Sequence, residues 1–236
     1  MLLRVETTQD RGRVVVATAD LQPGVIGLQL LAETAIIVVP PYDNRIPSTA
    51  IDQCPRFPEE LQSKMDPNFW ASYWCYKSQP DEIQAMIRDF YTELDCSTAK
   101  TIRRLVTPVA KVYDVTDIDE FVHISMVFHF NAVTVNPPSS DGHGAGTNYG
   151  RGLFEIACRM SHSCKPNCSW ISSQDGTQKL VRLIAPVKQG EELTISYTDC
   201  LLLPTHTRRQ ALLRSKNFCC NSGKVPVRCE GNELPK

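Results

Sequence analysis

Residues 159–168 decide the fold of this chain, and they read Arg159-Met160-Ser161-His162-Ser163-Cys164-Lys165-Pro166-Asn167-Cys168. Pro166 keeps the residue before it out of helical geometry, and the small polar residues around it make a poor core element. One imidazole and two thiols bring groups that can bind or react. A single histidine such as His162 is more often a hydrogen-bonded core residue than a functional one. The stretch therefore points to chemistry only together with a second observation.

The second observation is a segment that ends on a tyrosine, residues 189–197, with the sequence QGEELTISY. Gln189 and Gly190 form a turn that feeds a short strand, and the strand ends at Tyr197. A phenol at the end of a strand can project its hydroxyl into a cleft, where the hydroxyl can donate or accept a hydrogen bond. Taken with the stretch around His162, it predicts a functional site built from two separate segments of the chain.

Short strands are expected on both sides of these segments and at the start of the chain. Near the N-terminus, residues 13–17 form a β-branched run, residues 21–24 a turn and residues 36–39 a second apolar run. After residue 131 the β pattern returns, interrupted by a surface loop at residues 136–150. The expected strands of this part cover residues 132–135, 153–157, 168–172, 180–185 and 193–197, with a hairpin turn at Asp175-Gly176.

The middle third of the chain has helical spacing instead. Pro80 opens a segment with apolar residues at helical intervals, namely Ile83, Met86, Ile87, Phe90 and Leu94. Asp117 followed by Glu120 resembles a capping box, which predicts the start of another helix that continues toward Phe128. The fold class expected from these patterns is α+β, with strands around a mostly helical insertion.

The order of the motifs resembles the SET-domain protein lysine methyltransferases, and within them the SET and MYND domain branch. Residues 161–167 are similar to the signature Asn-His-Ser-Cys-x-Pro-Asn, and residues 190–197 are similar to the signature Gly-Glu-Glu-Leu-x-x-x-Tyr. Further matches lie in residues 11–14 with Ala17 and Pro23-Gly24, in residues 131–135, in residues 152–155, in residues 198–200 and in residues 208–218. The resemblance covers residues 4–40 and 126–229.

The resemblance implies a SET fold, in which small twisted β-sheets are closed by a C-terminal pseudoknot. It implies N-terminal SET strands at residues 1–40, a mostly helical insertion at residues 41–125, a catalytic SET core at residues 126–200 and a post-SET-like tail at residues 201–236. The branch usually carries a zinc-binding MYND module in the insertion. We expect that module to be absent, because residues 41–125 contain only Cys54, Cys75 and Cys96, too few for two zinc sites.

The activity implied by the resemblance is methyl transfer from S-adenosylmethionine to a lysine ε-amine of a histone or another protein. Such a reaction needs alignment, exclusion of water and a lysine that has lost its proton. Tyr197 is the expected catalytic residue, since its hydroxyl would orient the amine near the transferred methyl group. The expected cofactor-binding residues are Arg11, Gly12, Arg13, Asn131, Ser161, His162 and Phe218.

Two departures from the family pattern leave alternatives open. Ser161 stands where the signature has asparagine, which removes an amide donor and acceptor from the cofactor site. The zinc-binding tail of the family is also altered, so the expected ligands of one zinc ion are Cys164, Cys220 and Cys229, with Cys219 as a strained fourth candidate. One alternative is therefore a catalytically decayed SET-fold binding module. Another is a zinc-organised interaction protein with a basic docking tail.

The composition and net charge of the chain limit the classes of partner that we expect it to bind. Hydrophobic residues make up 42% of the 236 residues and charged residues 22%, as in a packed globular chain rather than a disordered one. The 25 Lys and Arg balance 26 Asp and Glu, so direct sequence-specific binding of nucleic acid is not expected. No apolar run approaches a membrane span, and Met1-Leu2-Leu3-Arg4 leads into polar residues. We expect an intracellular protein, cytoplasmic or nuclear, that acts on another protein.

Overall fold

A computed structural model describes residues 2–9, 12–24, 27–40, 54–135, 150–173, 178–197, 204–216, 218 and 220. The chain divides into two compact units. The first, here the signature unit, comprises Met1–Ala32, Arg159–Ile171 and Leu180–Lys236, and it holds both sequence signatures. The second, here the helical unit, comprises Glu33–Cys158 and Ser172–Lys179.

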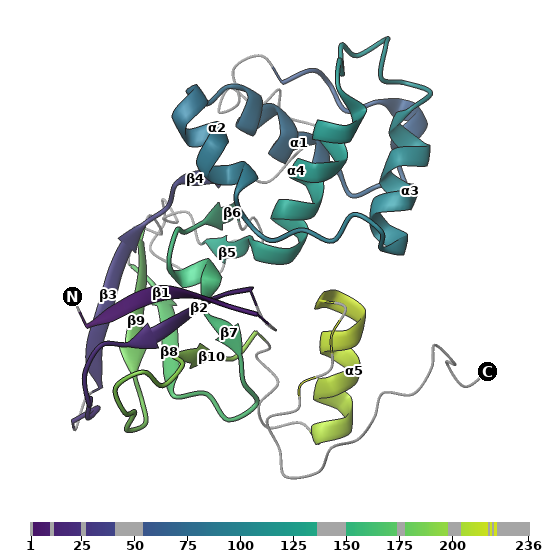
Figure 1. Ribbon diagram of the computed structural model, residues 1–236. Helices are drawn as coiled ribbons and strands as arrows, with labels where there is room; N and C mark the ends of the chain where they lie inside the picture. The colour runs from purple at the N-terminus through teal and green to yellow at the C-terminus, as the bar shows by residue number, and fades with distance from the viewer. Residues whose placement is uncertain are drawn as a thin grey trace, which may run out of the picture. The chain divides into compact units, whose positions relative to one another are not determined.

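The signature unit begins with an antiparallel pair of strands, β1 (Leu3–Thr8) and β2 (Gly12–Ala17), drawn in purple in Figure 1. The β-branched run of β2 is buried along its last four residues, which gives the pair its stability. The far side of β2 receives the second signature, because Leu193 donates its backbone N–H to Val15 and Ala17 donates its own to Glu191. The N-terminal strands therefore support the segment that leads to Tyr197.

The two signatures meet through a pair of strands of only two residues each. β7 (Ser161–His162) runs parallel to β10 (Thr194–Ile195), with Ser161 opposite Thr194 and His162 opposite Ile195. Parallel strands need a long connection, and here the chain passes through β8 (Cys168–Ser172) and β9 (Gln178–Leu183) on the way. These two strands share a sheet with β3 (Leu28–Thr34), in the order β3-β9-β8. A helix, α5 (Thr205–Lys216), follows near the C-terminus.

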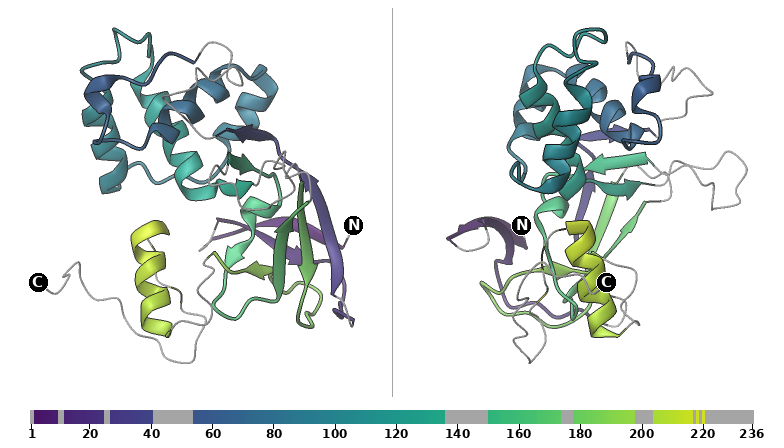
Figure 2. Two further views of the ribbon diagram at one scale, coloured as in Figure 1. Left: turned by 180° about the vertical axis from the view of Figure 1, so that it is seen from behind. Right: turned by 90° about the vertical axis from the view of Figure 1, so that its right-hand side faces the viewer.

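The helical unit is built around one central helix, α4 (Ile118–Asn131), which packs against α1 (Pro67–Lys77), α2 (Asp81–Arg88) and α3 (Ser97–Val106). Both views of Figure 2 show these helices, coloured from blue to teal, as one bundle. Apolar residues cover most of the circumference of α4, as expected for a helix that other helices surround. A short 3₁₀ helix, η1 (Glu59–Leu61), precedes the bundle.

Aromatic rings fill the core between α1 and α4. The indole of Trp70 is fully buried, and its Nε1 donates to the carbonyl of Pro55 over 2.9 Å. The ring of Phe121 on α4 lies 5.8 Å from the Trp70 ring and 4.8 Å from the Tyr73 ring, centroid to centroid. Large rings in such tilted contacts contribute much of the stability of a core.

A small sheet completes this unit, with β4 (Ile37–Val39), β6 (Gly150–Leu153) and β5 (Val133–Val135) in the order β4-β6-β5. The central strand needs glycine because its neighbours approach closely. A Cβ atom at Gly150 would lie 2.9 Å from the carbonyl oxygen of Val39, and one at Gly152 would lie 2.9 Å from a methyl group of Val135. Within the described residues, no helix has the length and apolarity to span a bilayer.

The structure confirms the α+β class and corrects several expected elements. The strand expected at residues 153–157 is wrong: β6 ends at Leu153, and residues Ala157–Arg159 form a 3₁₀ helix, η2. The cause is Glu33, whose carboxylate accepts the backbone N–H groups of Ile156 and Ala157 at 2.8 and 2.9 Å and so fixes a turn. The sequence patterns also missed β1 and β3, and the expected turn at Asp175-Gly176 lies outside the described residues.

The two expected helices of the middle third are present with differences. α2 begins after Pro80 but ends at Arg88, so Leu94 lies beyond the helix and is exposed. Asp117 caps α4 by accepting the backbone N–H of Glu120 at 2.9 Å. The reciprocal half of a capping box is not made by Glu120, because its carboxylate binds Tyr76, Lys77 and Arg88. The expected domain boundaries at residues 40, 125 and 200 stay a prediction.

Candidate active site

His162 holds the end of the second signature. Its Nδ1 accepts the backbone N–H of Tyr197 over 3.0 Å. An accepting Nδ1 requires that the ring hydrogen sit on Nε2 in the neutral imidazole. Nε2 lies 3.3 Å from the Sγ of Cys164, so the ring donates to that sulfur. The pKa of His162 is lowered to about 4, mainly by burial and further by the positive charge of Arg208, and the ring is neutral at physiological pH.

The phenol of Tyr197 points back toward the first signature. Its hydroxyl donates to the carbonyl oxygen of Met160 over 2.6 Å. The ring centroid lies 5.5 Å from that of His162 and 6.3 Å from that of Phe218, and the last two are 6.0 Å apart. Three rings and one carbonyl oxygen therefore gather where the two signatures meet. The expectation that Tyr197 lies beside His162 is confirmed.

Asn167, the last residue of the first signature, fastens the two segments together. Its Nδ2 donates to the carbonyl of Glu192 and its Oδ1 accepts the backbone N–H of Thr194, both over 2.8 Å. The backbone N–H of Ser163 donates to the carbonyl of Ile195 over 2.9 Å. A carboxamide has both a donor and an acceptor, so one side chain can satisfy two backbone groups of the opposing strand. This role of Asn167 was not expected from the sequence.

The other described residues of the signature unit that were expected to bind the cofactor lie on different strands. Gly12 opens β2 with a φ of +67°, a conformation that other residues rarely adopt, and Arg13 follows it opposite Thr7 of β1. Ser161 lies in β7, opposite Thr194. Arg11 lies outside the described residues. The structure therefore brings His162, Ser161 and Phe218 into one region with Tyr197, whereas Gly12 and Arg13 lie at the start of β2, the second strand of the neighbouring hairpin.

Asn131 belongs to the helical unit and is the last residue of α4. Its Nδ2 donates to the carbonyl of Tyr91 over 2.8 Å and to that of Val127 over 2.7 Å. Both hydrogens of the amide are therefore used within the helical unit. Any contact of this side chain with a cofactor would have to use the carboxamide oxygen as an acceptor.

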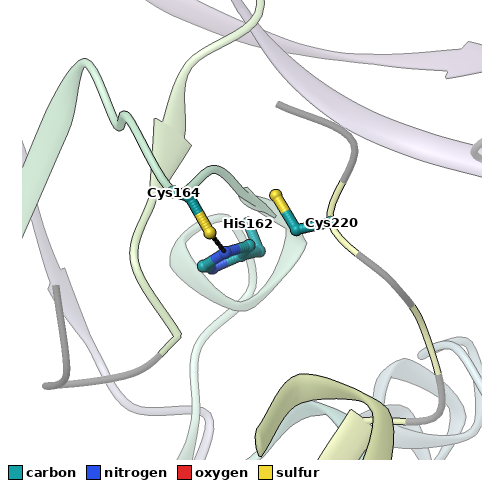
Figure 3. Close-up of side chains that lie close together, drawn as sticks. All are labelled: His162, Cys164 and Cys220. Carbon is teal, nitrogen blue, oxygen red and sulfur yellow. Dashed lines mark hydrogen bonds between the residues drawn. The ribbon is translucent and has the colours of Figure 1, made fainter. Parts of the chain in front are cut away.

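A group of sulfur and nitrogen atoms lies beside the rings. Figure 3 shows Cys164 and Cys220 close to the His162 ring, and the ligand atoms of the three residues all lie within 4.8 Å of one another. The two thiols fit a soft metal such as zinc. The imidazole does not fit, because Nδ1 accepts from Tyr197 and Nε2 carries the hydrogen. Cys229, the third expected ligand, lies outside the described residues, as does Cys219.

Two further features escaped the sequence patterns. The carbonyl of Met160 is a backbone group, so its contact with Tyr197 leaves no mark on the residue type at that position. Lys216, the last residue of α5, places its Nζ 5.9 Å from the centroid of the Tyr197 ring. The basic character of the C-terminal segment was visible in the sequence, but its approach to the tyrosine was not.

Residues 12–198 match the SET domain family. The match spans most of the chain and includes β2, both signatures and the helical insertion. This chain belongs to the SET domain family. A solved structure described as the SET domain of LSMT bound to lysine and AdoHcy supports the fold. Its TM-score is 0.56 at 10% identity, with 92% of this chain and 53% of that chain covered.

Several relatives of this SET domain come from the SET and MYND branch. The chain is 36% identical over 81 residues to mouse "Histone-lysine N-methyltransferase SMYD3", covering 34% of this chain and 17% of the mouse protein. It is 30% identical over 152 residues to the Drosophila melanogaster "SET domain-containing protein SmydA-8, isoform A", covering 64% of this chain and 30% of the fly protein. Human "N-lysine methyltransferase SMYD2" is 39% identical over 74 residues. The chain spans less than a third of the length of these relatives.

Proposed function

We propose that this SET domain transfers a methyl group from S-adenosylmethionine to the ε-amine of a lysine in another protein. The observation that carries the proposal is the 2.6 Å contact of the Tyr197 hydroxyl with the carbonyl of Met160, at the junction of the two signatures. The similarity to mouse SMYD3 and human SMYD2, both named as lysine methyltransferases, supports it. The substrate is a protein that presents a lysine, from a histone tail or elsewhere.

Tyr197 would position the reacting amine. Its hydroxyl donates its hydrogen to Met160, and a phenolic oxygen that donates can also accept a hydrogen bond from an amine. A fixed hydroxyl holds the amine in line with the transferred methyl group, and such alignment is a large part of the rate enhancement of a two-substrate reaction. The lysine must also be neutral to attack, and the loss of water around an amine at a half-buried site favours the neutral form.

The surroundings of Tyr197 fit a sulfonium cofactor. The faces of the three rings and the carbonyl oxygen of Met160 are negative partners for a positively charged sulfur and its methyl group. The lowered pKa of His162 matters here, because a neutral imidazole does not repel that charge. When bound, S-adenosylmethionine supplies the activated methyl group. The residues proposed to hold it are Arg11, Gly12, Arg13, Asn131, Ser161, His162 and Phe218.

We also propose that Cys164, Cys220 and Cys229 hold one zinc ion. The described pair of thiols supports this, and the ion would tie the first signature to the tail that carries Phe218. The His162 ring lies against this pair, with its Nε2 3.3 Å from the Sγ of Cys164. Metal analysis of the purified protein should find about one zinc per chain, and Cys164→Ser should lower that value.

The test is mass spectrometry of lysine-containing proteins after incubation with this protein and S-adenosylmethionine. The wild type should add methyl groups to lysine, and Tyr197→Phe should lower the rate by about 100-fold or more, because a misaligned amine loses most of its advantage. Tyr91→Phe is the matched control, since Tyr91 is exposed and lies in the helical unit. No methyl transfer despite confirmed cofactor binding would contradict the proposal.

Ser161 favours a second candidate, a SET-fold binding module without catalysis. The residue lies in β7 with a shorter side chain than the asparagine of the signature, so it offers the cofactor fewer hydrogen bonds. Calorimetry with S-adenosylmethionine separates the two candidates. Micromolar binding supports the enzyme, and Ser161→Asn should then tighten it. If neither the wild type nor this variant binds, the binding module is the better description.

A further inference from the structure

Lys216 brings a primary amine of the chain itself to the tyrosine of the candidate site. Its Nζ lies 5.9 Å from the centroid of the Tyr197 ring, within the range of a cation–π contact. The hydroxyl of the same ring binds the carbonyl of Met160. The amine therefore lies over the ring of the tyrosine whose hydroxyl the proposed reaction uses to position a lysine.

The C-terminal helix is anchored so that Lys216 stays near this ring. Leu212 of α5 is fully buried, which fixes one face of the helix. Arg209 donates from Nε to the carbonyl of Cys220 over 3.1 Å, which ties the helix to the tail segment beyond it. Cys220 in turn lies beside His162. Lys216 and the candidate site thus share one local network within the signature unit.

Other described lysines lie in different surroundings. In the signature unit, Lys188 is 78% exposed and its Nζ binds Asp20 over 2.8 Å. In the helical unit, the Nζ of Lys179 donates to the carbonyl of Thr134 and to Ser172, over 3.0 and 2.9 Å. Lys216 differs from these two lysines in that its Nζ lies over an aromatic ring.

We infer that Lys216 is a modification site of this protein, methylated by its own Tyr197 site, an inference that rests on the proposed function. The electron pair of the neutral Nζ attacks the methyl carbon of the sulfonium. The new N–C bond forms as the C–S bond breaks, and the leaving pair stays on sulfur as a neutral thioether. The proton displaced from the nitrogen goes to water. An amine held beside the site needs no encounter, so the step is first order in protein.

The test is peptide mapping by mass spectrometry of the purified full chain, incubated with S-adenosylmethionine at several protein concentrations. Methyl groups should accumulate on Lys216 with a rate constant that does not change over a tenfold dilution. Tyr197→Phe should lower that rate by at least tenfold. Lys188→Arg is the matched control. It should leave methylation of Lys216 unchanged, because the Nζ of Lys188 binds the carboxylate of Asp20.

A second readout needs no cofactor. The NMR signals of the Lys216 ε-methylene protons should be shifted upfield by the Tyr197 ring, and the shift should be lost in Tyr197→Leu. The corresponding protons of Lys188 should keep their ordinary position in both proteins. An ordinary position for Lys216 in the wild type would overturn the inference without touching the proposed function.

The remaining outcomes separate the two proposals. If added proteins are methylated in a Tyr197-dependent way while Lys216 stays unmodified, the inference about Lys216 is overturned and the proposed function stands. Methylation of Lys216 that slows in proportion to dilution also overturns it, because the modification is then made by another molecule. If no lysine of any protein is methylated, both proposals fall together.

Discussion

The helical unit and the candidate site of the signature unit are held together in opposite ways. The bundle of α1–α4 buries large rings, among them Trp70, Tyr73 and Phe121, on helices of several turns. The site depends on β7 and β10, two residues each, and on a few hydrogen bonds made by the side chains of His162 and Asn167. Burial of apolar area stabilises the first, whereas a few directed bonds position the second.

This difference predicts that some substitutions mainly lower the free energy of unfolding, whereas others mainly lower the rate of methyl transfer. A change in the aromatic core should lower the free energy of unfolding by several kcal/mol. A change in the bonds between the signatures should cost less stability and more activity, because an error of about 1 Å in alignment is enough to slow a reaction about 100-fold. Four substitutions or conditions test this separation.

The largest loss of stability is expected for Trp70→Ala. Truncation of a buried aromatic residue costs about 3–5 kcal/mol, and here the hydrogen bond to Pro55 is lost as well. Denaturant unfolding followed by circular dichroism measures the change, and Trp70→Phe should lose less than half as much. A loss below 1 kcal/mol for Trp70→Ala would show that these rings do not hold the helical unit together.

The next largest loss is expected for Asn167→Ala, about 2–3 kcal/mol. The substitution leaves the carbonyl of Glu192 and the N–H of Thr194 without their partner in a half-buried place. Methyl transfer should fall by a larger factor than cofactor affinity, since β10, which leads to Tyr197, loses its alignment. Asn68→Ala should change stability by only about 0.5 kcal/mol or less, because its side chain binds Asp66 at the surface. Equal effects for both variants would contradict the role of Asn167.

A smaller effect is expected from acid through His162. The unfolded ring binds its proton near pH 6.5 and the folded ring only near pH 4. Between these values the unfolded state binds more protons, so stability falls as the pH falls from about 6.5 to about 4. The loss is on the order of 1–2 kcal/mol, less than the full shift because the ring is partly exposed. His162→Gln should flatten this part of the profile, and an unchanged slope would contradict the assignment.

The smallest effect is expected for the ion pair of Arg103 and Asp119, which joins α3 and α4 at the surface. Both side chains are largely exposed, and such pairs contribute about 0–1 kcal/mol. Asp119→Asn should therefore change the midpoint of thermal unfolding only slightly, and less so in high salt. If Asp119→Asn lowered the free energy of unfolding as much as Trp70→Ala does, a surface ion pair would stabilise the protein as strongly as a buried ring, which would contradict the comparison.

The elements that sequence reasoning found are those whose pattern is local. The β-branched run of residues 13–17 became β2, and the cap at Asp117 marked the start of α4. The strand expected at residues 153–157 failed because a carboxylate more than a hundred positions away, Glu33, binds the backbone there. Single-sequence patterns do not contain such a partner.

The site was predictable only in part, for the same reason. The motifs identified Tyr197 and His162, and the structure places them together. The carbonyl of Met160 and the amine of Lys216 were not found, since each acts through its position relative to a distant ring. Periodicity and capping report on neighbours along the chain, whereas the reacting geometry depends on neighbours in space.

The most direct measurement is a crystal structure of this protein with S-adenosylhomocysteine, the demethylated product of the cofactor. The sulfur is expected to face the Tyr197 hydroxyl and the carbonyl of Met160, with Phe218 against the adenine. A product bound elsewhere, or a Tyr197 phenol turned into a filled apolar interior, would contradict a methyl-transfer site at the junction of the two signatures.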